Sequence, residues 1–309
     1  MGETPPASQT TASQATASQA TASQRVALGE LAPEDTVLRE LDDDGVLLLT
    51  LNRPGRRNTW AYDMELRYVA LLDEAMADPG VRVIVLTGAG EAFCAGMDME
   101  VLRRATTDPS FVRPVRPSAT IPRTVPKPII AAVDGACAGV GFVQALMADL
   151  RFTTARSKWT TSFTRRGLIA EDTVTWLLPR LVGAGHAADL LFSGRVVRGD
   201  EAVRMGLANR LVEPDELLPA ALDWARDVAR NCSPWAVAQV KQQLARDDAA
   251  DIEQSRLAAN TVLDVARGKP DYREGVASFR ERRPPRFEGL PADHPRIVLA
   301  AEPDAPPSH

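Results

Sequence analysis

VIVLTGAGEAFCAGMDM (residues 83–99) and PKPIIAAVDGACAGVGF (residues 126–142) decide the fold. Each segment contains a short apolar run, typical of a buried strand, and then a turn rich in glycine and alanine. Small residues allow a ligand to approach backbone N–H groups closely. The second turn leads into a predicted helix, whose first N–H groups are free and favour negative charge. Two such turns facing one pocket would form a pair of hydrogen-bond donors for an oxyanion, whereas tight strand-to-helix packing explains either turn alone.

Predicted strands and helices alternate on both sides of these segments. Residues 46–54 predict a buried strand and residues 63–77 a helix, followed by strands at 81–90 and 128–134. From residue 233 onward the pattern is helical. The apolar residues expected on helix faces are Leu66, Val69 and Leu72; Val174, Leu177, Leu178 and Leu181; and Val237, Val240 and Leu244. Strands that alternate with helices predict an α/β fold.

Composition and pattern divide the chain into four segments. Residues 1–30 form a low-complexity segment in which the unit TASQA occurs twice from Thr11, and we expect a disordered tail. Residues 31–232 carry the α/β pattern, and residues 233–290 are predicted to be a C-terminal helical region. Residues 291–309 are rich in proline and are expected to be a flexible tail.

The composition excludes several functional classes. The 309 residues include 41 acidic and 36 basic residues, giving a net charge of −5, which argues against nucleic acid as the main partner. No apolar run approaches the ~20 residues needed to cross a bilayer, so no membrane association is expected. Cys94, Cys137 and Cys232 are too widely spaced for a metal motif or a disulfide framework, which predicts no metal and a cytoplasmic location.

Familiar catalytic patterns are missing as well. Three histidines, two of them near the C-terminus, make a histidine-based triad a poor hypothesis. Gly88 and Gly90 match the start of a dinucleotide-binding fingerprint, but Phe93 occupies the position of its third glycine. Cys94 has no histidine partner in the sequence pattern, so we interpret it as a packed residue.

Taken together, the two glycine-containing segments resemble the enoyl-CoA hydratase/isomerase, or crotonase, family. NRPGRRN (residues 52–58), the segment from residue 178 to 212, SPWAVAQVK (233–241) and EGVASFRERRPPRF (274–287) extend the resemblance over residues 37–287. It implies a crotonase-like ββα spiral core with a C-terminal helical trimerisation region. It also implies an acyl-CoA substrate, no cofactor beyond the CoA moiety of that substrate, and a homo-oligomer, either a trimer or a dimer of trimers.

The resemblance also implies roles for particular residues. The backbone N–H groups of Met97 and Val140 correspond to the family's oxyanion hole; valine replaces a family glycine at 140, but the donor is the backbone. The residues that the resemblance places at the CoA moiety are Arg56, Arg57, Asn58, Ala95, Asp98 and Met99. Trp60, Val143 and Phe163 are the expected lining of the acyl pocket.

A basic stretch lies between the two glycine-containing turns of this acidic protein. It comprises Arg103, Arg104, Arg113, Arg116, Arg123 and Lys127. Such a stretch could attract the phosphates of CoA towards the site. A solvated loop is the alternative interpretation.

The sequence departs from the family at the two catalytic glutamates of its hydratases, because Val143 and Phe163 occupy those positions and neither can transfer a proton. Glu171 corresponds to an aspartate that dienoyl-CoA isomerases of the family use. Glu171 is therefore the candidate for a lone acid/base, and a pocket formed by Val143 and Phe163 is expected to desolvate it. For Asp172 we expect a helix N-cap.

The resulting hypothesis is an enzyme that stabilises a thioester enolate and isomerises or hydrates an enoyl-CoA. The alternative is a catalytically silent acyl-CoA-binding or assembly subunit. The sequence leaves open which acyl group is bound and in which pathway, with fatty acid metabolism as one possibility. It also leaves open the choice between trimer and hexamer and the role of the TASQA repeats.

Overall fold

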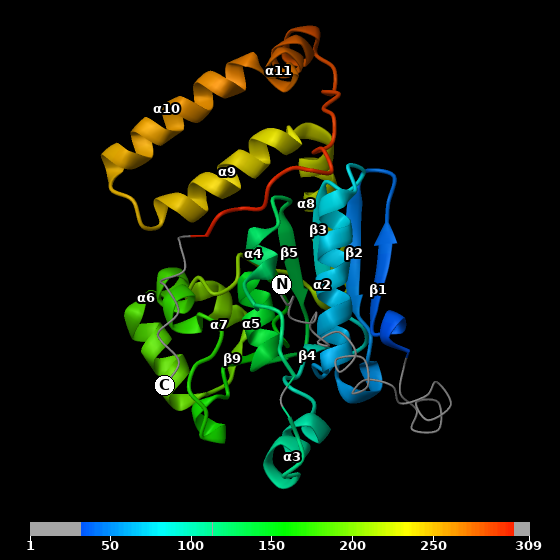
Figure 1. The fold of residues 1–309 in the computed structure, drawn as a ribbon, viewed down its shortest axis with the longest axis vertical. Helices are drawn as coiled ribbons and strands as arrows, with labels where there is room; N and C mark the ends of the chain where they lie inside the picture. Colours follow the sequence, from blue (N-terminus) through cyan, green and yellow to red (C-terminus); the bar gives the residue numbers. More distant parts are fainter. Residues whose placement is uncertain (1–31, 113, 300–309) are drawn as a thin grey trace, which may run out of the picture.

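The computed structural model describes residues 32–112 and 114–299 as a mixed α/β structure (Figure 1). A six-stranded sheet has the order β1-β2-β3-β5-β7-β10, and a four-stranded sheet has the order β4-β6-β8-β9. The strands of the large sheet are β1 (Val37–Leu41), β2 (Val46–Leu51), β3 (Val83–Gly88), β5 (Ile129–Val133), β7 (Leu150–Thr153) and β10 (Arg210–Leu211). Those of the small sheet are β4 (Ala92–Cys94), β6 (Ala136–Ala138), β8 (Lys158–Thr160) and β9 (Val197–Arg198).

The chain alternates between the two sheets as it advances. β3 of the large sheet leads to β4 of the small sheet, β5 leads to β6 and β7 leads to β8, and neighbouring strands in each series are parallel. The helices of the core are α2 (Tyr62–Ala77), α3 (Met99–Thr107), α4 (Ile121–Thr124), α5 (Val140–Met147), α6 (Val174–Ser193), α7 (Gly199–Arg204) and α8 (Leu217–Asn231). The predicted ββα spiral is confirmed.

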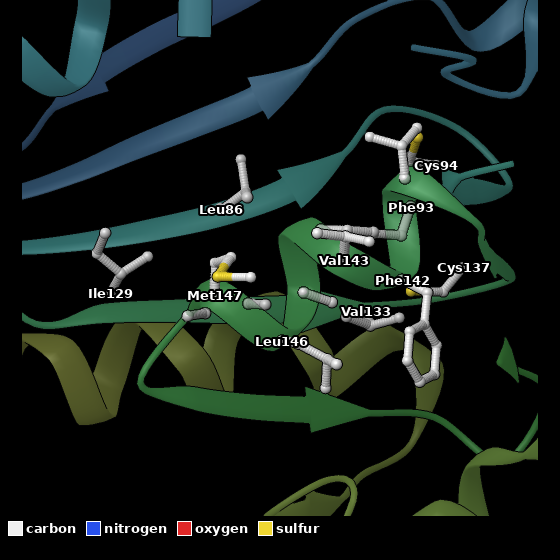
Figure 2. Close-up of a cluster of buried hydrophobic side chains, with 14 of the residues drawn as sticks. Leu86, Phe93, Cys94, Ile129, Val133, Cys137, Phe142, Val143, Leu146 and Met147 are labelled. Atoms are coloured by element: carbon white, nitrogen blue, oxygen red, sulfur yellow. The ribbon is translucent and has the colours of Figure 1, made fainter. Parts of the chain in front are cut away.

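Both faces of the central strands of the large sheet are buried. Successive side chains of a strand point to opposite faces, so each of these strands contributes to two cores. One face of β2, β3, β5 and β7 packs against α8, and the other contributes to the main core together with α2, α5 and α6. Figure 2 shows the centre of this core, where Val143, Leu146 and Met147 of α5 lie beside Leu86 of β3 and Ile129 of β5.

The helix predicted at residues 63–77 is present, but of its predicted face Leu72 is buried, Val69 is half-buried and Leu66 is exposed. Leu66 is 57% exposed, and the buried face comprises Met64, Glu65, Tyr68, Leu71, Leu72 and Ala75. The spacing of Leu66, Val69 and Leu72 fitted a helix, but the buried stripe is rotated by about 100° around the helix axis from the predicted one. In α6, the expected residues Val174, Leu177 and Leu178 are buried.

Three C-terminal helices extend from the core: α9 (Pro234–Asp247), α10 (Ile252–Gly268) and α11 (Pro270–Glu281). Figure 1 places them at the end of the molecule opposite α3. The face predicted from Val237, Val240 and Leu244 does not pack on the core of this chain, since Leu244 is 72% exposed. These helices therefore present apolar side chains outward, among them Leu257, Val276 and Phe279.

The segment after α11 returns to the core. The N–H of Ile297 donates to the carbonyl oxygen of Thr124 at 2.8 Å, and that of Val298 donates to Oε1 of Gln242 at 2.8 Å. The prediction of a flexible tail is therefore wrong for residues 291–299. Residues 300–309 and the predicted N-terminal tail, apart from its boundary, lie outside the described residues.

Candidate functional site

The first glycine-containing turn is held against the segment that carries Trp60. The N–H of Trp60 donates to the oxygen of Gly96 at 2.7 Å, and the N–H of Asp98 donates to the oxygen of Trp60 at 2.9 Å. These two bonds bracket Met97, which pairs with Trp60 as an isolated parallel bridge. Within the described part of the chain, the N–H of Met97 itself has no acceptor. The turn therefore presents one fixed, available donor.

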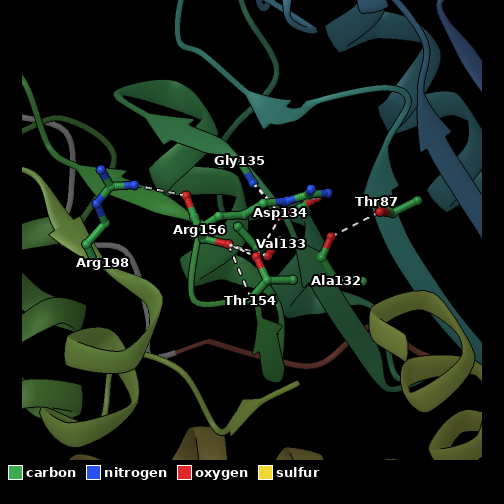
Figure 3. A network of polar contacts seen from close by, with 9 residues as sticks. Thr87, Ala132, Val133, Asp134, Gly135, Thr154, Arg156 and Arg198 are labelled. Atoms are coloured by element: carbon green, nitrogen blue, oxygen red, sulfur yellow. Dashed lines mark hydrogen bonds and ion pairs between the residues drawn. The ribbon is translucent and has the colours of Figure 1, made fainter. Parts of the chain in front are cut away.

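The second turn is fixed at the junction of β5 and β6. Oδ1 of Asp134 accepts from the N–H of Gly135 at 2.9 Å and from the hydroxyl of Thr154 at 2.6 Å, and Arg156 forms an ion pair with the same carboxylate. Figure 3 shows this network, which Arg198 joins by donating a hydrogen bond to the backbone oxygen of Arg156. Sequence reasoning missed Asp134, although an aspartate between a strand and a glycine is a typical turn signal.

The helix that follows begins with a free donor. Gly139, at φ +50°, precedes the first helical residue, Val140, and its own N–H donates to Thr160 at 3.1 Å. The N–H of Val140 has no acceptor among the described residues, as expected for the first turn of a helix. The backbone at 140 is thus compatible with the donor role that the resemblance implies.

The two turns lie in contact. A Cβ atom added to Gly139 would lie 3.9 Å from Cα of Gly96, and one added to Gly96 would lie 3.4 Å from the oxygen of Ala138. Gly141 is tighter, because an added Cβ would lie 2.4 Å from the oxygen of Cys94. Since Met97 and Val140 each follow one of the touching glycines, both donors project from one small region.

This contact predicts a measurable cost for a methyl group at 141. Gly141→Ala is expected to lower the free energy of unfolding in urea by about 1–3 kcal/mol, because the backbone of Cys94 must move. Gly185→Ala is the matched control, since Gly185 lies in α6 with nothing within 4 Å of an added Cβ; it is expected to gain about 0.5–1 kcal/mol. Equal effects of the two substitutions would contradict close packing of the turns.

Asn58 supports the site from inside the protein. Its side chain is fully buried and donates to the oxygens of Ala89 and Ala92 at 2.8 and 2.6 Å, while Oδ1 accepts from the N–H of Arg53 at 2.8 Å. Its φ of +53° lies in the left-handed region, which asparagine tolerates better than most residues. The side-chain amide of Asn58 thus binds the first turn to residues 52–58, and the predicted position of Asn58 beside CoA stays a prediction.

Alanine at position 58 is expected to lower the free energy of unfolding by about 2–3 kcal/mol, since it leaves buried carbonyl and N–H groups without partners. Urea denaturation measures the change. Asn231→Ala is the control, because Asn231 is exposed and bonds only to Asp227 within α8; a change of about 0.5 kcal/mol or less is expected there. A similar loss in both variants would argue against the supporting role of Asn58.

Asp98 is a structural residue as well. It is 5% exposed, accepts from the N–H of Glu100 at 2.9 Å as the N-cap of α3, and pairs with Arg53 at 2.9 Å and Arg56 at 3.6 Å. Burial acts to raise its pKa, but the Glu100 N–H and the Arg53 guanidinium outweigh it and lower the pKa of Asp98. The carboxylate of Asp98 therefore holds the first turn and the start of α3 in place, and its predicted position beside CoA stays a prediction. Of the other predicted CoA contacts, Arg56, Arg57 and Met99 are exposed and Ala95 is half-buried.

The basic stretch between the turns carries less free charge than its sequence suggests. Arg116 forms a bidentate pair with buried Glu65, with both N–O distances at 2.8 Å. Lys127 is 2% exposed, and Nζ donates to the oxygens of Ala75 and Asp78 at the end of α2. Burial lowers the pKa of Lys127 to about 8. Arg103 and Arg104 pair with neighbouring acids, Arg123 lies over Trp176, and Arg113 lies outside the described residues.

The carboxyl groups before α6 differ in environment. Glu171 is exposed, and its carboxylate forms no hydrogen bond or ion pair with any residue of 32–112 or 114–299, so the burial expected for it is wrong for the single chain. Asp172 is half-buried, and burial raises its pKa, opposed by Arg116 and assisted by Glu65. The N-cap of α6 is Thr173, which corrects the role predicted for Asp172.

Three residues at and near this turn have strained backbone conformations. Asp172 and Thr173 have φ values of +54° and +64°, and Ser162, next to Phe163, has +58°. Positive φ values are uncommon for residues other than glycine because they raise the conformational energy of the backbone. Residues strained in this way are often found at functional sites. Val143 and Phe163 are buried in the main core, and their predicted role in lining an acyl pocket stays a prediction.

The described residues contain neither a metal-binding cluster nor a helix suited to span a membrane. Among residues 32–112 and 114–299, no group of three His, Cys, Asp or Glu side chains is arranged to hold a metal ion. Over the same ranges, no helix combines the length and apolar character that a membrane crossing needs.

Comparisons with known proteins agree with the fold. The family model for enoyl-CoA hydratase/isomerase matches residues 42–290. A 1,2-epoxyphenylacetyl-CoA isomerase of Escherichia coli (strain K12) is 31% identical over 253 residues, covering 80% of this chain and 96% of its own length. The crystal structure of an enoyl-CoA hydratase from Mycobacterium marinum is 44% identical, with a TM-score of 0.59, and covers 68% of this chain and 96% of its own. That of an enoyl-CoA hydratase from Mycobacterium smegmatis is 29% identical, with a TM-score of 0.72 and coverages of 82% and 98%.

Proposed function

Because the chain belongs to the enoyl-CoA hydratase/isomerase family, we propose that it binds an acyl-CoA thioester and stabilises the enolate formed from it. The backbone N–H groups of Met97 and Val140 are the proposed oxyanion hole. The observation that supports this assignment is that both donors are free of acceptors among the described residues while the glycines before them touch. Loss of one such donor typically costs 10²–10³-fold in rate.

Isomerisation of a double bond is the reaction that the residues support best. Val143 and Phe163 replace the carboxylates of the two-glutamate hydration route. The similar protein from Escherichia coli is named a 1,2-epoxyphenylacetyl-CoA isomerase, so an isomerase occurs among the relatives, although the substrate in its name is an epoxide. One carboxylate suffices for a 1,3-shift: it takes the α proton, the electron pair moves onto the thioester oxygen as a dienolate, and the proton returns at the γ carbon.

Glu171 is the proposed acid/base. Its carboxylate is unpaired in the described part of the chain, whereas Asp172 interacts electrostatically with Arg116 and Glu65. A bound acyl-CoA, or a neighbouring subunit that covers this turn, would supply the desolvation that the single chain lacks. Hydration of an enoyl-CoA, with Glu171 positioning the water, is the related alternative.

Arg56 and Arg57 are the proposed contacts to the CoA phosphates, because both side chains are exposed beside the first turn. The outward apolar residues of α9, α10 and α11 support a homo-oligomer, since exposed apolar patches commonly mark interfaces. No cofactor beyond the CoA moiety enters this scheme.

The test mixes purified protein with 3-enoyl-CoA, 2-enoyl-CoA and dienoyl-CoA and follows the absorbance of the conjugated thioester. Conversion of 3-enoyl-CoA to 2-enoyl-CoA is the expected result. Loss of 2-enoyl-CoA absorbance through water addition, without isomerisation, would identify a hydratase instead. Binding of acyl-CoA without turnover of any thioester would contradict an enzyme and favour the silent subunit.

A further inference from the structure

Two buried polar atoms without hydrogen-bond partners and the hydroxyl-bearing side chain of a buried tyrosine line one small cavity. Trp60 is fully buried and Gln144 is 3% exposed, and neither Nε1 of Trp60 nor Oε1 of Gln144 has a hydrogen-bond partner. Tyr68 is 2% exposed, and its hydroxyl makes no hydrogen bond with any residue that the structure describes. The three side chains line the same cavity, together with Glu65.

Such a concentration of unsatisfied groups is unusual. More than about nine in ten buried polar groups in proteins are hydrogen-bonded, and each exception costs about 1–3 kcal/mol. About 10 Å³ of the cavity can hold the centre of a water molecule. That is room for about one oxygen-sized group. The cavity thus combines unused hydrogen-bonding capacity with space for a single polar atom.

The chemistry of the three groups specifies what fits. The indole N–H of Trp60 can only donate, Oε1 of Gln144 can only accept, and the hydroxyl of Tyr68 can do both. A hydroxyl group satisfies all of them, because it accepts one hydrogen bond or more and donates another. An alkyl group in the same place would leave them unpaired.

The cavity is connected by the chain to both proposed oxyanion donors. Gln144 follows Val140 by four residues on α5, so the two lie on one face of that helix, about 6 Å apart along its axis. The backbone of Trp60 brackets Met97 through the two hydrogen bonds described above. The cavity therefore lies about one helical turn beyond the place where the thioester oxygen would be held.

We propose that this cavity is a subsite for a hydroxyl group on the acyl chain, beyond the reacting carbons, and that the preferred substrates are hydroxylated acyl-CoA thioesters. The inference rests on the proposed function, since it assumes that an acyl-CoA enters between Met97 and Val140. The competing occupant is an ordered water that stays in place when any acyl-CoA binds.

Binding of saturated thioesters tests the subsite independently of turnover. Dissociation constants are measured by calorimetry for butanoyl-, pentanoyl- and hexanoyl-CoA and for the same thioesters with a terminal hydroxyl. At one chain length, the wild-type protein is expected to bind the hydroxylated thioester at least 10-fold more tightly than its parent. In Gln144→Leu, Trp60→Phe and Tyr68→Phe, this ratio is expected to fall below about 3.

Tyr68→Phe keeps the ring and removes only the hydroxyl, so it stays informative if Gln144→Leu fails to fold. Tyr272→Phe is the matched control, because it removes the same group from a half-exposed position on α11 and is expected to keep the wild-type ratio. A ratio near one at every chain length, or a ratio that survives in all three variants, overturns the subsite and leaves a water. Failure of every thioester to bind would instead refute the proposed function.

Discussion

Proline at position 140 is expected to lower kcat for the thioester reaction about 10²–10³-fold while the protein stays folded. Val140 is the first residue of α5, where proline is well tolerated because its missing N–H has no partner within the helix. The substitution therefore removes one proposed oxyanion donor and little else. Steady-state kinetics and thermal melting followed by circular dichroism measure the two effects separately.

Val140→Ala is the matched control, because it shortens the side chain to a similar extent and keeps the N–H. We expect its kcat to stay within a few-fold of the wild type. If Val140→Pro melts normally and reacts as fast as Val140→Ala, the backbone at 140 does not contact the developing charge.

Glu171→Gln is expected to slow isomerisation about 10²–10⁴-fold, because the amide cannot carry the proton between the two carbons. The substitution keeps the size of the side chain, and Glu171 forms no ion pair within the described ranges that its loss would break. Rates with 3-enoyl-CoA at saturating substrate measure the effect on kcat.

Asp172→Asn provides the neighbouring control on the same turn. A smaller loss is expected, since Asp172 lies near Arg116 and Glu65 and contributes to the local charge rather than to proton transfer. If Asp172→Asn abolished the reaction and Glu171→Gln left it intact, the proposed roles of the two carboxyl groups would be wrong.

Local patterns predicted the strands and the positions of both turns, since short apolar runs and glycines act through neighbouring residues. The buried face of α2 was harder to predict, because Leu66 and Tyr68 both fit a helical stripe and only tertiary packing selects between them. The structural role of Asn58 was not predicted, because its partners at 89 and 92 are more than 30 residues away. A contact of this kind leaves no periodic signal.

Charged residues gave the least reliable predictions. Lys127 looked like part of a solvated basic stretch, yet it binds the carbonyl oxygens at the end of α2. Two residues of the same type have different roles when one is buried and the other is exposed, and burial depends on the whole fold. The partnerless groups of Trp60 and Gln144 could not be inferred either, since a missing partner is a property of the packed interior.

Exchange of the α proton in D₂O tests enolate stabilisation most directly. A saturated acyl-CoA is incubated with the enzyme, and deuterium at the α carbon is followed by NMR. Exchange catalysed by the wild type, and slowed in Val140→Pro by about the same factor as kcat, is the predicted result. Turnover of 3-enoyl-CoA without α exchange, or exchange in Val140→Pro at the wild-type rate, would contradict the paired-amide site.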